Sequence, residues 1–236
     1  MSTLLPFFAG LILFFVIRIT VRRMRGREMM RAFSRMNNIP EIPESTEINN
    51  ILCLALAYLA RYPNIQSRLR DEIDRKVGRS RLARLEEQAR MPYMEAFVHE
   101  ILRHSGAAAG FVAPRTTSRS IQLEGFSLPS GTTVFANMWF ILNDPNHWTD
   151  PQVFRPERFI DDKGCFRKDE RCLLSIAGGP SCPAQHMVLS IITLFLAGLI
   201  QNFAFETSYC QPLLHGNIFP GNVGRVMRGI RVTNRI

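Results

Sequence analysis

The sequence predicts a mainly α-helical domain with a small β-sheet, placed behind an N-terminal transmembrane helix. Apolar residues recur at helical spacing in several separate segments, and short apolar runs alternate with glycine and proline turns between residues 120 and 137. Residues 4–17 are almost uninterruptedly apolar. At 236 residues, the chain is long enough to bury one sizeable core.

The apolar N-terminus predicts a membrane anchor. The run from Leu4 to Ile17 continues to Val21, which gives the minimum spanning length if Arg18 extends toward the headgroups. A cleaved signal peptide is the alternative, but it would carry positive charge before the apolar run and a small-residue cleavage site after it. This sequence has neither feature. It therefore favours an uncleaved signal anchor over residues 1–21, with the bulk of the chain on the cytoplasmic side.

Charge and cysteine usage narrow the class of protein further. A net charge of +9 could indicate a nucleic-acid partner, but the arginines cluster directly beside the apolar segment, which favours a membrane surface and no nucleic acid. The five cysteines have irregular spacing, without metal-ligand pairs, and an odd number does not suit a disulfide framework. The sequence therefore indicates a reducing compartment. The clustered arginines are Arg18, Arg22, Arg23, Arg25, Arg27 and Arg31, and the cysteines are Cys53, Cys165, Cys172, Cys182 and Cys210.

Three helices are predicted after a basic stretch and linker at residues 22–47. The first covers Ile48 to Ala60, and the second begins at Pro63 and closes at Gly78. Apolar residues recur at every fourth position of the second helix, namely Ile65, Leu69, Ile73 and Val77. The third helix opens near Pro92 and carries a buried face, formed by Met94, Phe97, Val98, Ile101 and Leu102.

The second half of the chain predicts a small sheet and a core helix. Three short strands are expected to form a small hairpin sheet, at Ser120 to Leu123, Phe126 to Leu128 and Thr132 to Asn137. A loop-rich stretch over residues 143–181 precedes an apolar helix from Ala184 to Phe203.

Three short motifs could carry chemistry. Glu100 and Arg103 lie three residues apart on the third helix, so their side chains can form an ion pair; a solvated surface pair is the simpler interpretation. The second motif, Phe-Arg-Pro-Glu-Arg-Phe, ends at Phe159. The third contains Cys182 just before a helix start, where the helix dipole favours a thiolate. Alone, such a cysteine is more commonly a packed core residue.

In this order, the motifs resemble the haem-binding end of the haem-thiolate monooxygenases, the cytochrome P450 family. The resemblance runs from about residue 48 to the C-terminus and includes the stretches Val112-Ala-Pro-Arg115 and Asn143-Asp-Pro145. It implies a partial cytochrome P450 fold over residues 48–236, consisting of the C-terminal helices and the cysteine-ligand loop. In such a fold, residues 108–112 would border the substrate pocket.

The resemblance also assigns roles to single residues, although it assigns no catalytic residue in this chain. Arg158 would join Glu100 and Arg103 in a structural ion-pair network. Cys182 would be the axial ligand of haem b iron, Gly178 would allow close approach of the backbone to the cofactor, and Arg115 would reach a haem propionate.

The implied function is a monooxygenase that incorporates one oxygen atom from O2 into a lipophilic small molecule, such as a steroid or a xenobiotic. The implied partners are the endoplasmic reticulum membrane and an NADPH-dependent reductase that donates electrons. Two other functions stay open. The chain could be a catalytically inactive, membrane-anchored fragment or splice product of such an enzyme, or a basic membrane-surface module unrelated to haem.

The sequence departs from the family pattern in three places. The phenylalanine seven residues before the ligand and the basic residue two before it are replaced by Ser175 and Pro180, which predicts weaker haem retention. Where the oxygen-activating helix should carry an acid followed by threonine, the chain reads Pro43-Glu-Ser-Thr46-Glu47. We further expect about half of the usual fold to be absent before Glu47.

Overall fold

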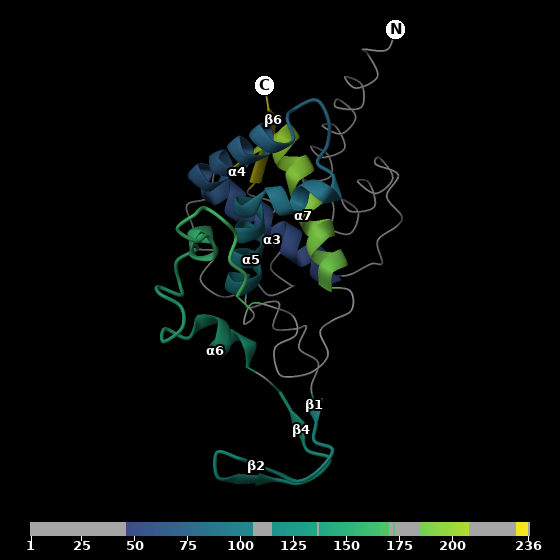
Figure 1. Cartoon of the computed structure of the whole chain (residues 1–236), viewed down its shortest axis with the longest axis vertical. Helices are drawn as coiled ribbons and strands as arrows, with labels where there is room; N and C mark the ends of the chain where they lie inside the picture. Colours follow the sequence, from purple (N-terminus) through teal and green to yellow (C-terminus); the bar gives the residue numbers. More distant parts are fainter. Residues whose placement is uncertain are drawn as a thin grey trace.

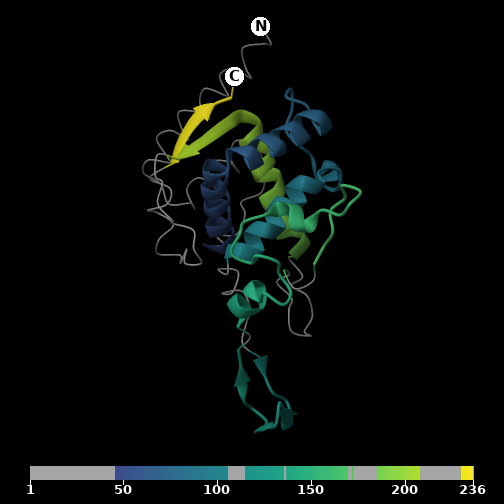
Figure 2. The ribbon, with the colours of Figure 1, turned by 90° about the vertical axis from the view of Figure 1, so that its left-hand side faces the viewer.

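The computed structural model describes residues 46–105, 115–135, 137–169, 172, 185–207 and 230–235. Four α-helices form the body of the molecule, and a narrow arm of short strands extends from it (Figures 1 and 2). The helices of the body are α3 (Thr46–Arg61), α4 (Pro63–Lys76), α5 (Pro92–Ser105) and α7 (Gln185–Asn202), with the 3-10 helix η1 (Leu85–Arg90) beside them. The prediction of a mainly helical fold with small sheets is confirmed for these residues.

Helices α3 and α4 confirm the first two predicted helices. Every residue of α3 from Ile51 to Ala60 is buried, as expected for a helix that is apolar on all sides. In α4, the residues at every fourth position are buried and face the core. The helix ends where the backbone N–H groups of Val77 and Gly78 both donate to the carbonyl of Ile73, and Gly78 adopts a positive φ of 86°.

Helix α5 begins at Pro92, as predicted, and its first turn is capped from α4. One carboxylate oxygen of Glu72 accepts the backbone N–H of Tyr93 at 2.9 Å, and the other accepts that of Met94 at 2.8 Å. These N–H groups have no partner within the helix, because the first turn of an α-helix leaves its donors unpaired. The buried Glu72 carboxylate therefore fixes the start of α5 against α4.

The predicted apolar helix corresponds to α7, and the chain then continues directly into a strand. Phe203 begins β5 (Phe203–Thr207), which pairs antiparallel with β6 (Ile230–Asn234). The sequence did not predict this ladder. It is joined to α4 by Gln66, whose side-chain amide donates to the carbonyl of Phe205 and accepts its backbone N–H, at 2.9 and 3.0 Å.

The predicted small sheet is divided into two separate ladders. Strands β2 (Ile121–Leu123) and β3 (Phe126–Leu128) form the expected hairpin around Glu124 and Gly125. The third predicted strand is short, β4 (Thr133–Val134), and pairs with β1 (Arg115–Thr116) and not with the hairpin. The prediction of one sheet was therefore wrong in its pairing, because β1 lies closer to β4 once the hairpin has folded on itself. We call residues 115–135 the β arm.

The chain leads from the β arm back to the body through a short helix and a long loop. Helix α6 (Met138–Asn143) is capped by Asn137, whose side chain accepts the backbone N–H of Phe140 at 3.1 Å. The loop then contains the 3-10 helix η3 (Pro156–Phe159), which lies against α5.

The described residues bury two apolar clusters. The larger cluster joins α3, α4, α5, α7 and β5. The smaller cluster connects α5 with α6 and the following loop, through Ala96, Met138, Leu142, Trp148, Phe159 and Cys172. Helix α5 contributes to both, so its two faces connect the helical body to the loop.

The expectations for the N-terminus concern mostly residues outside the described ranges. The predicted anchor at residues 1–21 lies outside the described residues, as do residues 22–45 of the predicted basic stretch and linker at residues 22–47, whose last two residues, Thr46 and Glu47, instead begin α3. Among the helices that the structure describes, none has both the length and the apolar character needed to span a bilayer.

Replacing Glu72 by alanine should destabilise the protein by about 1–3 kcal/mol, because two buried N–H groups at the start of α5 would lose their acceptor. The measurement is the free energy of unfolding from urea titration. Asp71→Ala is the matched control on the same helix, since this neighbour is exposed, and its effect should stay within about 0.5 kcal/mol. Equal effects of the two substitutions would contradict the capping role.

Candidate functional site

A buried carboxylate on α5 is the centre of the site. Glu100 and Arg103 are both 0% exposed. The guanidinium of Arg103 donates two hydrogen bonds to Glu100, from Nε to Oε2 at 2.8 Å and from Nη2 to Oε1 at 3.0 Å. This bidentate geometry is the strongest form of a carboxylate–arginine pair. The solvated surface pair that the spacing alone would suggest is therefore not what the structure shows.

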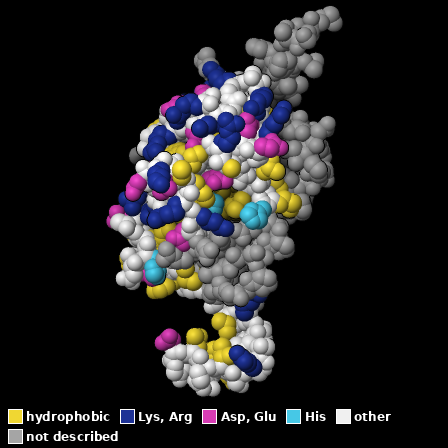
Figure 3. Space-filling model, viewed as in Figure 1, with side chains coloured by type: hydrophobic (Ala, Val, Ile, Leu, Met, Phe, Trp, Pro, Cys, Tyr) yellow, Lys and Arg dark blue, Asp and Glu magenta, His cyan; other side chains and the backbone are white. Residues whose placement is uncertain are grey.

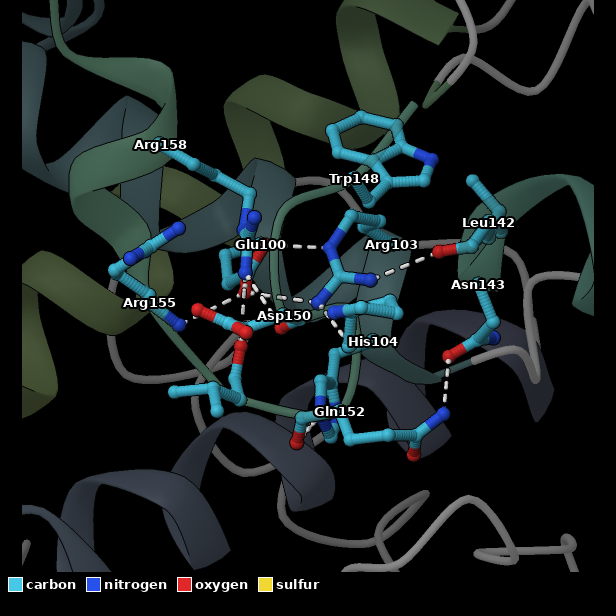
Figure 4. A network of polar contacts seen from close by, with 12 residues as sticks. Glu100, Arg103, His104, Leu142, Asn143, Trp148, Asp150, Gln152, Arg155 and Arg158 are labelled. Carbon is cyan, nitrogen blue, oxygen red and sulfur yellow. Dashed lines mark hydrogen bonds and ion pairs between the residues drawn. The ribbon is translucent and has the colours of Figure 1, made fainter. Parts of the chain in front are cut away.

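Two further donors reach the same carboxylate from the 149–159 loop. The Nε of Arg158 donates to Oε1 of Glu100 at 3.1 Å, and the backbone N–H of Arg155 donates to the same oxygen at 2.8 Å (Figure 4). The structure thus brings together all three residues for which the sequence suggested an ion-pair network. Arg155 contributes through its backbone, a contact that no side-chain motif could indicate.

The cations in this network outnumber the anion, and backbone carbonyls compensate for the difference. Arg103 also donates to the carbonyls of Leu142 at 2.8 Å and Pro151 at 2.9 Å. Arg158 donates to the carbonyls of Thr149 at 2.9 Å and Val153 at 3.0 Å. Arg158 therefore orders loop backbone that forms no helix or strand, and Arg103 connects the same loop to the C-terminal turn of α6. Burial lowers the pKa of Arg158, while the Glu100 carboxylate acts in the opposite direction.

Aromatic side chains close this polar centre on one side. The guanidinium carbon of Arg103 lies 5.4 Å from the centre of the Trp148 ring, within cation–π range. The indole N–H of Trp148 donates to the carbonyl of Ile141 at 3.1 Å, and its ring packs against Phe159. The buried network is thus shielded by Trp148 of the loop, which α6 and η3 hold in place through Ile141 and Phe159.

A second polar connection links α3 to the same loop. His104 is buried, and its Nδ1 lies 2.5 Å from the hydroxyl of Tyr58, while its Nε2 lies 3.0 Å from the carbonyl of Gln152. Both contacts are satisfied by a neutral imidazole that accepts from Tyr58 and donates to Gln152. Phe154 stacks on the Tyr58 ring, with their centroids 4.1 Å apart.

The second motif also reaches α4 and the start of α5. The Glu157 carboxylate accepts the hydroxyl of Tyr93 at 2.9 Å and pairs with Arg68, whose guanidinium lies over the Tyr93 ring. Burial raises the pKa of Tyr93, and the neighbouring Glu157 raises it further. Phe154, Arg155 and Glu157 therefore contact α3, α4 and α5, which explains why this motif fixes a loop otherwise lacking regular structure.

The residues expected to hold a cofactor are only partly described. Arg115 stands at the start of β1 with an exposed side chain. Cys182 and Gly178 lie outside the described residues, as do Ser175, Pro180 and residues 108–112. In the described ranges, no cluster of three or more His, Cys, Asp and Glu side chains could hold a metal ion.

Sequence reasoning missed several residues of the site. Tyr58, His104 and Trp148 were not singled out, although each is a buried aromatic or imidazole group with a polar partner. Their only sequence signal is the density of aromatic residues around the motifs. The contacts of His104 with Tyr58 and Gln152 join residues 46 and 48 positions apart, which only the fold brings together.

Replacing Arg103 by lysine should cost about 3–5 kcal/mol of stability, because the buried carboxylate and two carbonyls would lose donors that a single ammonium cannot replace. Arg158→Lys should be clearly destabilising as well. Arg155→Lys is the matched control in the same motif, because Arg155 reaches Glu100 through its backbone, and its effect should stay within about 0.5 kcal/mol. Urea unfolding measures all three variants; similar values for Arg155→Lys and Arg158→Lys would rule out the proposed side-chain network.

Stability should fall in mild acid because of His104. Burial lowers the pKa of His104 in the folded protein, whereas in the unfolded chain this pKa is about 6.5. The unfolded state therefore binds the proton more readily than the folded state does. The contribution of neutral His104 to the free energy of unfolding is complete above the unfolded pKa and is lost as the pH falls through the folded pKa. Melting temperatures between about pH 7.5 and 5 measure this slope. His104→Asn should flatten it, and an unchanged slope would contradict the assignment; His99, whose pKa is also lowered by burial, accounts for the remainder.

Comparison with known proteins identifies the family. The sequence model of the family described as Cytochrome P450 matches residues 49–217. Cytochrome P450 2D28 of Mesocricetus auratus is 36% identical over 171 residues, which is 72% of this chain and 34% of that protein. Cytochrome P450 2D20 of the same species is 37% identical over 161 residues, 68% of this chain and 32% of that protein.

Human cytochrome P450 1A1 gives a similar result, with 36% identity over 161 residues, 67% of this chain and 31% of that protein. The chain spans about a third of the length of the curated relatives it matches. The match includes most of α3, all of α4, α5, η3 and α7, and with them the buried network of Glu100. The resemblance found in the sequence motifs is confirmed: the chain belongs to the cytochrome P450 family.

Proposed function

We propose that this chain is a membrane-anchored haem-thiolate monooxygenase in which Cys182 is the axial ligand of haem b iron. Its reaction would incorporate one oxygen atom from O2 into a lipophilic small molecule, such as a steroid or a xenobiotic. The observation that carries the proposal is the buried Glu100–Arg103–Arg158 network, which lies in the part of the chain that matches the family. A buried network of this kind holds a long loop in one position against α5, which a cofactor site requires.

The described residues fit this cofactor in two respects. Helix α7 begins at Gln185, so the positive end of its dipole lies just after Cys182 in the chain and favours the thiolate. The exposed Arg115 at the start of β1 suits a haem propionate. Gly178 would let the backbone approach the flat cofactor closely. Bound haem would supply the chemistry of oxygen activation, to which a thiolate ligand contributes electron density.

The proposal includes a location and a partner. The apolar segment at residues 1–21 would anchor the chain in the endoplasmic reticulum membrane, and the arginines that follow it would face the cytoplasm. An NADPH-dependent reductase would donate electrons from the same side. The domain that receives them would cover residues 48–236, joined to the anchor by the basic stretch and linker at residues 22–47.

A catalytically inactive fragment or splice product is the second candidate. Two substitutions in the cysteine loop favour it. Ser175 stands where the family packs a phenylalanine beside the haem, and Pro180 stands where it places a basic residue. Both changes remove an interaction that retains the cofactor. The two candidates differ in substrate turnover, and the fragment would hold haem weakly or not at all.

The carbon-monoxide difference spectrum of the reduced protein, expressed in membranes, tests whether Cys182 holds haem, which the active enzyme requires. The active enzyme predicts the red-shifted band of a thiolate-ligated haem, and Cys182→Ser should remove this band without reducing the amount of protein. Cys165→Ser, at an exposed cysteine, is the matched control and should leave the band unchanged. If protein is present in the membrane but gives no band, the inactive fragment is the better description.

Restoring the two family residues should increase haem retention. Pro180→Arg would supply a cation for a propionate, and Ser175→Phe would fill the space beside the cofactor. The double variant should therefore contain more haem per protein, measured as absorbance of the extracted haem over protein mass. An unchanged ratio would contradict the explanation given for Ser175 and Pro180.

A further inference from the structure

Tyr58 of α3 and His104 of α5 form a buried phenol–imidazole pair beside the Glu100 network. The Tyr58 hydroxyl lies 2.5 Å from Nδ1 of His104, and the two residues are 2% and 9% exposed. The other ring nitrogen, Nε2, lies 3.0 Å from the carbonyl of Gln152 (Figure 4). A carbonyl can only accept, so Nε2 carries the hydrogen and Nδ1 presents its lone pair to the phenol. Burial raises the pKa of Tyr58, so the phenol keeps its proton, which is directed at a base.

This arrangement removes the main obstacle to oxidation of a buried phenol. Loss of an electron alone would leave a positive charge on a ring without access to water, which is strongly unfavourable. If the O–H bond breaks and an N–H bond forms at Nδ1 in the same step, Tyr58 becomes a neutral radical and the charge moves to His104. There the carbonyl of Gln152 accepts from the imidazolium. The Glu100 carboxylate favours the new charge, while the neighbouring guanidinium groups oppose it.

The neighbouring ring gives the pair a route to solvent. Tyr62 stacks on Tyr58, with ring centroids 5.9 Å apart and planes inclined by 8°, and Tyr62 is half-buried. An electron can therefore pass from the surface to Tyr58 through one aromatic contact. Arg61, the preceding residue, is exposed, and Figure 3 shows Lys and Arg side chains over much of the helical body. A positively charged surface attracts small anions, so the reductant that suits this site is anionic.

We propose that Tyr58 and His104 form a redox-active pair, in which a one-electron oxidant converts Tyr58 to a neutral radical and an anionic reductant restores it through Tyr62. In the forward step, the oxidant gains one electron and the phenolic proton moves to Nδ1 of His104. In the return step, the reductant supplies one electron by way of the Tyr62 ring, and the proton moves back to the phenol oxygen. The pair would return stray oxidising equivalents to the reductant before they reach the buried, oxidation-sensitive Met91 and Met94.

The inference rests on the proposed function only for the natural oxidant, because centres that activate O2 carry out one-electron chemistry. The pair itself lies within the described residues, and its oxidation needs no haem. An artificial oxidant therefore tests the pair even in chain that binds no cofactor.

A second buried tyrosine is less suited to oxidation and provides a matched control. The Tyr93 hydroxyl donates to the Glu157 carboxylate, so this phenol also has an acceptor for its proton. The guanidinium carbon of Arg68, however, lies 4.1 Å from the centre of the Tyr93 ring. A cation over the ring face opposes the loss of an electron from that ring. Tyr93 should therefore stay reduced while Tyr58 is oxidised.

Photo-oxidation followed by electron paramagnetic resonance of the full chain in detergent micelles tests the proposal. The oxidant is a ruthenium(III) polypyridyl complex, generated by light with an electron acceptor, and ring-deuterated tyrosine identifies the radical as tyrosyl. We expect a persistent tyrosyl signal in the unchanged protein, loss of most of it in Tyr58→Phe, and its retention in Tyr93→Phe. A signal that survives Tyr58→Phe, or no tyrosyl signal in the unchanged protein, would overturn the proposal.

His104→Gln tests the proton transfer. Glutamine can accept from Tyr58 and donate to Gln152 but is not a base, so the radical yield should fall to near that of Tyr58→Phe. In the unchanged protein, D2O should slow radical formation, because the O–H bond breaks in the same step. Equal yields in His104→Gln and the unchanged protein would contradict the coupling, as would the absence of a D2O effect. If His104→Gln loses its helical circular dichroism, the D2O comparison decides alone.

Tyr62→Phe tests the route to solvent. Phenylalanine keeps the stacked ring but is not oxidised by the complex, so ascorbate should reduce the Tyr58 radical several-fold more slowly than in the unchanged protein. An equal rate would overturn the route through Tyr62. A normal radical in chain without a carbon-monoxide band would count against the proposed function and support this inference separately.

Discussion

The buried carboxylate of Glu100 is the constraint on which the rest of the described structure depends. An anion without solvent exposure is tolerable only when donors satisfy it, and here Arg103, Arg158 and the backbone of Arg155 all do so. Their positions are not independent, because each donor must reach one of two oxygens. Buried ion pairs contribute little net stability over apolar packing, but leaving one partner unpaired costs several kcal/mol. Such a network therefore selects one arrangement of the loop over all others.

The network acts through α5, which is itself fixed from two directions. Glu72 of α4 caps its first turn, and His104 near its last turn is held by Tyr58 of α3. The helix thus presents Glu100 at a defined point, and the loop of residues 149–159 is ordered by reaching it. Helix α7 packs on the opposite part of the same core. The segment that leads to Cys182 therefore begins at a loop anchored on α5 and ends at a helix packed beside it, which is how the fold can support the proposed cofactor site.

Sequence patterns predicted the local parts of this structure well and the long-range parts poorly. The periodicity of Ile65, Leu69 and Ile73 located α4, since one helical face must be buried. Spacing placed Arg103 beside Glu100, because both lie on one helix. Arg158 is 58 residues from Glu100, and only the family resemblance connected them. Pairing of β1 with β4, and of β5 with β6, depends on the path of the intervening chain, which periodicity does not encode.

The most direct measurement of the central claim is hydrogen–deuterium exchange in Glu100→Gln, compared with the unchanged protein. If the carboxylate orders the loop, the amides of residues 149–159 should exchange at least about tenfold faster in the variant, while those of α3 and α4 keep their protection. Arg155 is the decisive position, since its N–H donates directly to Glu100. Equal protection of the loop in both proteins would contradict the account, because the loop would then be ordered by packing alone.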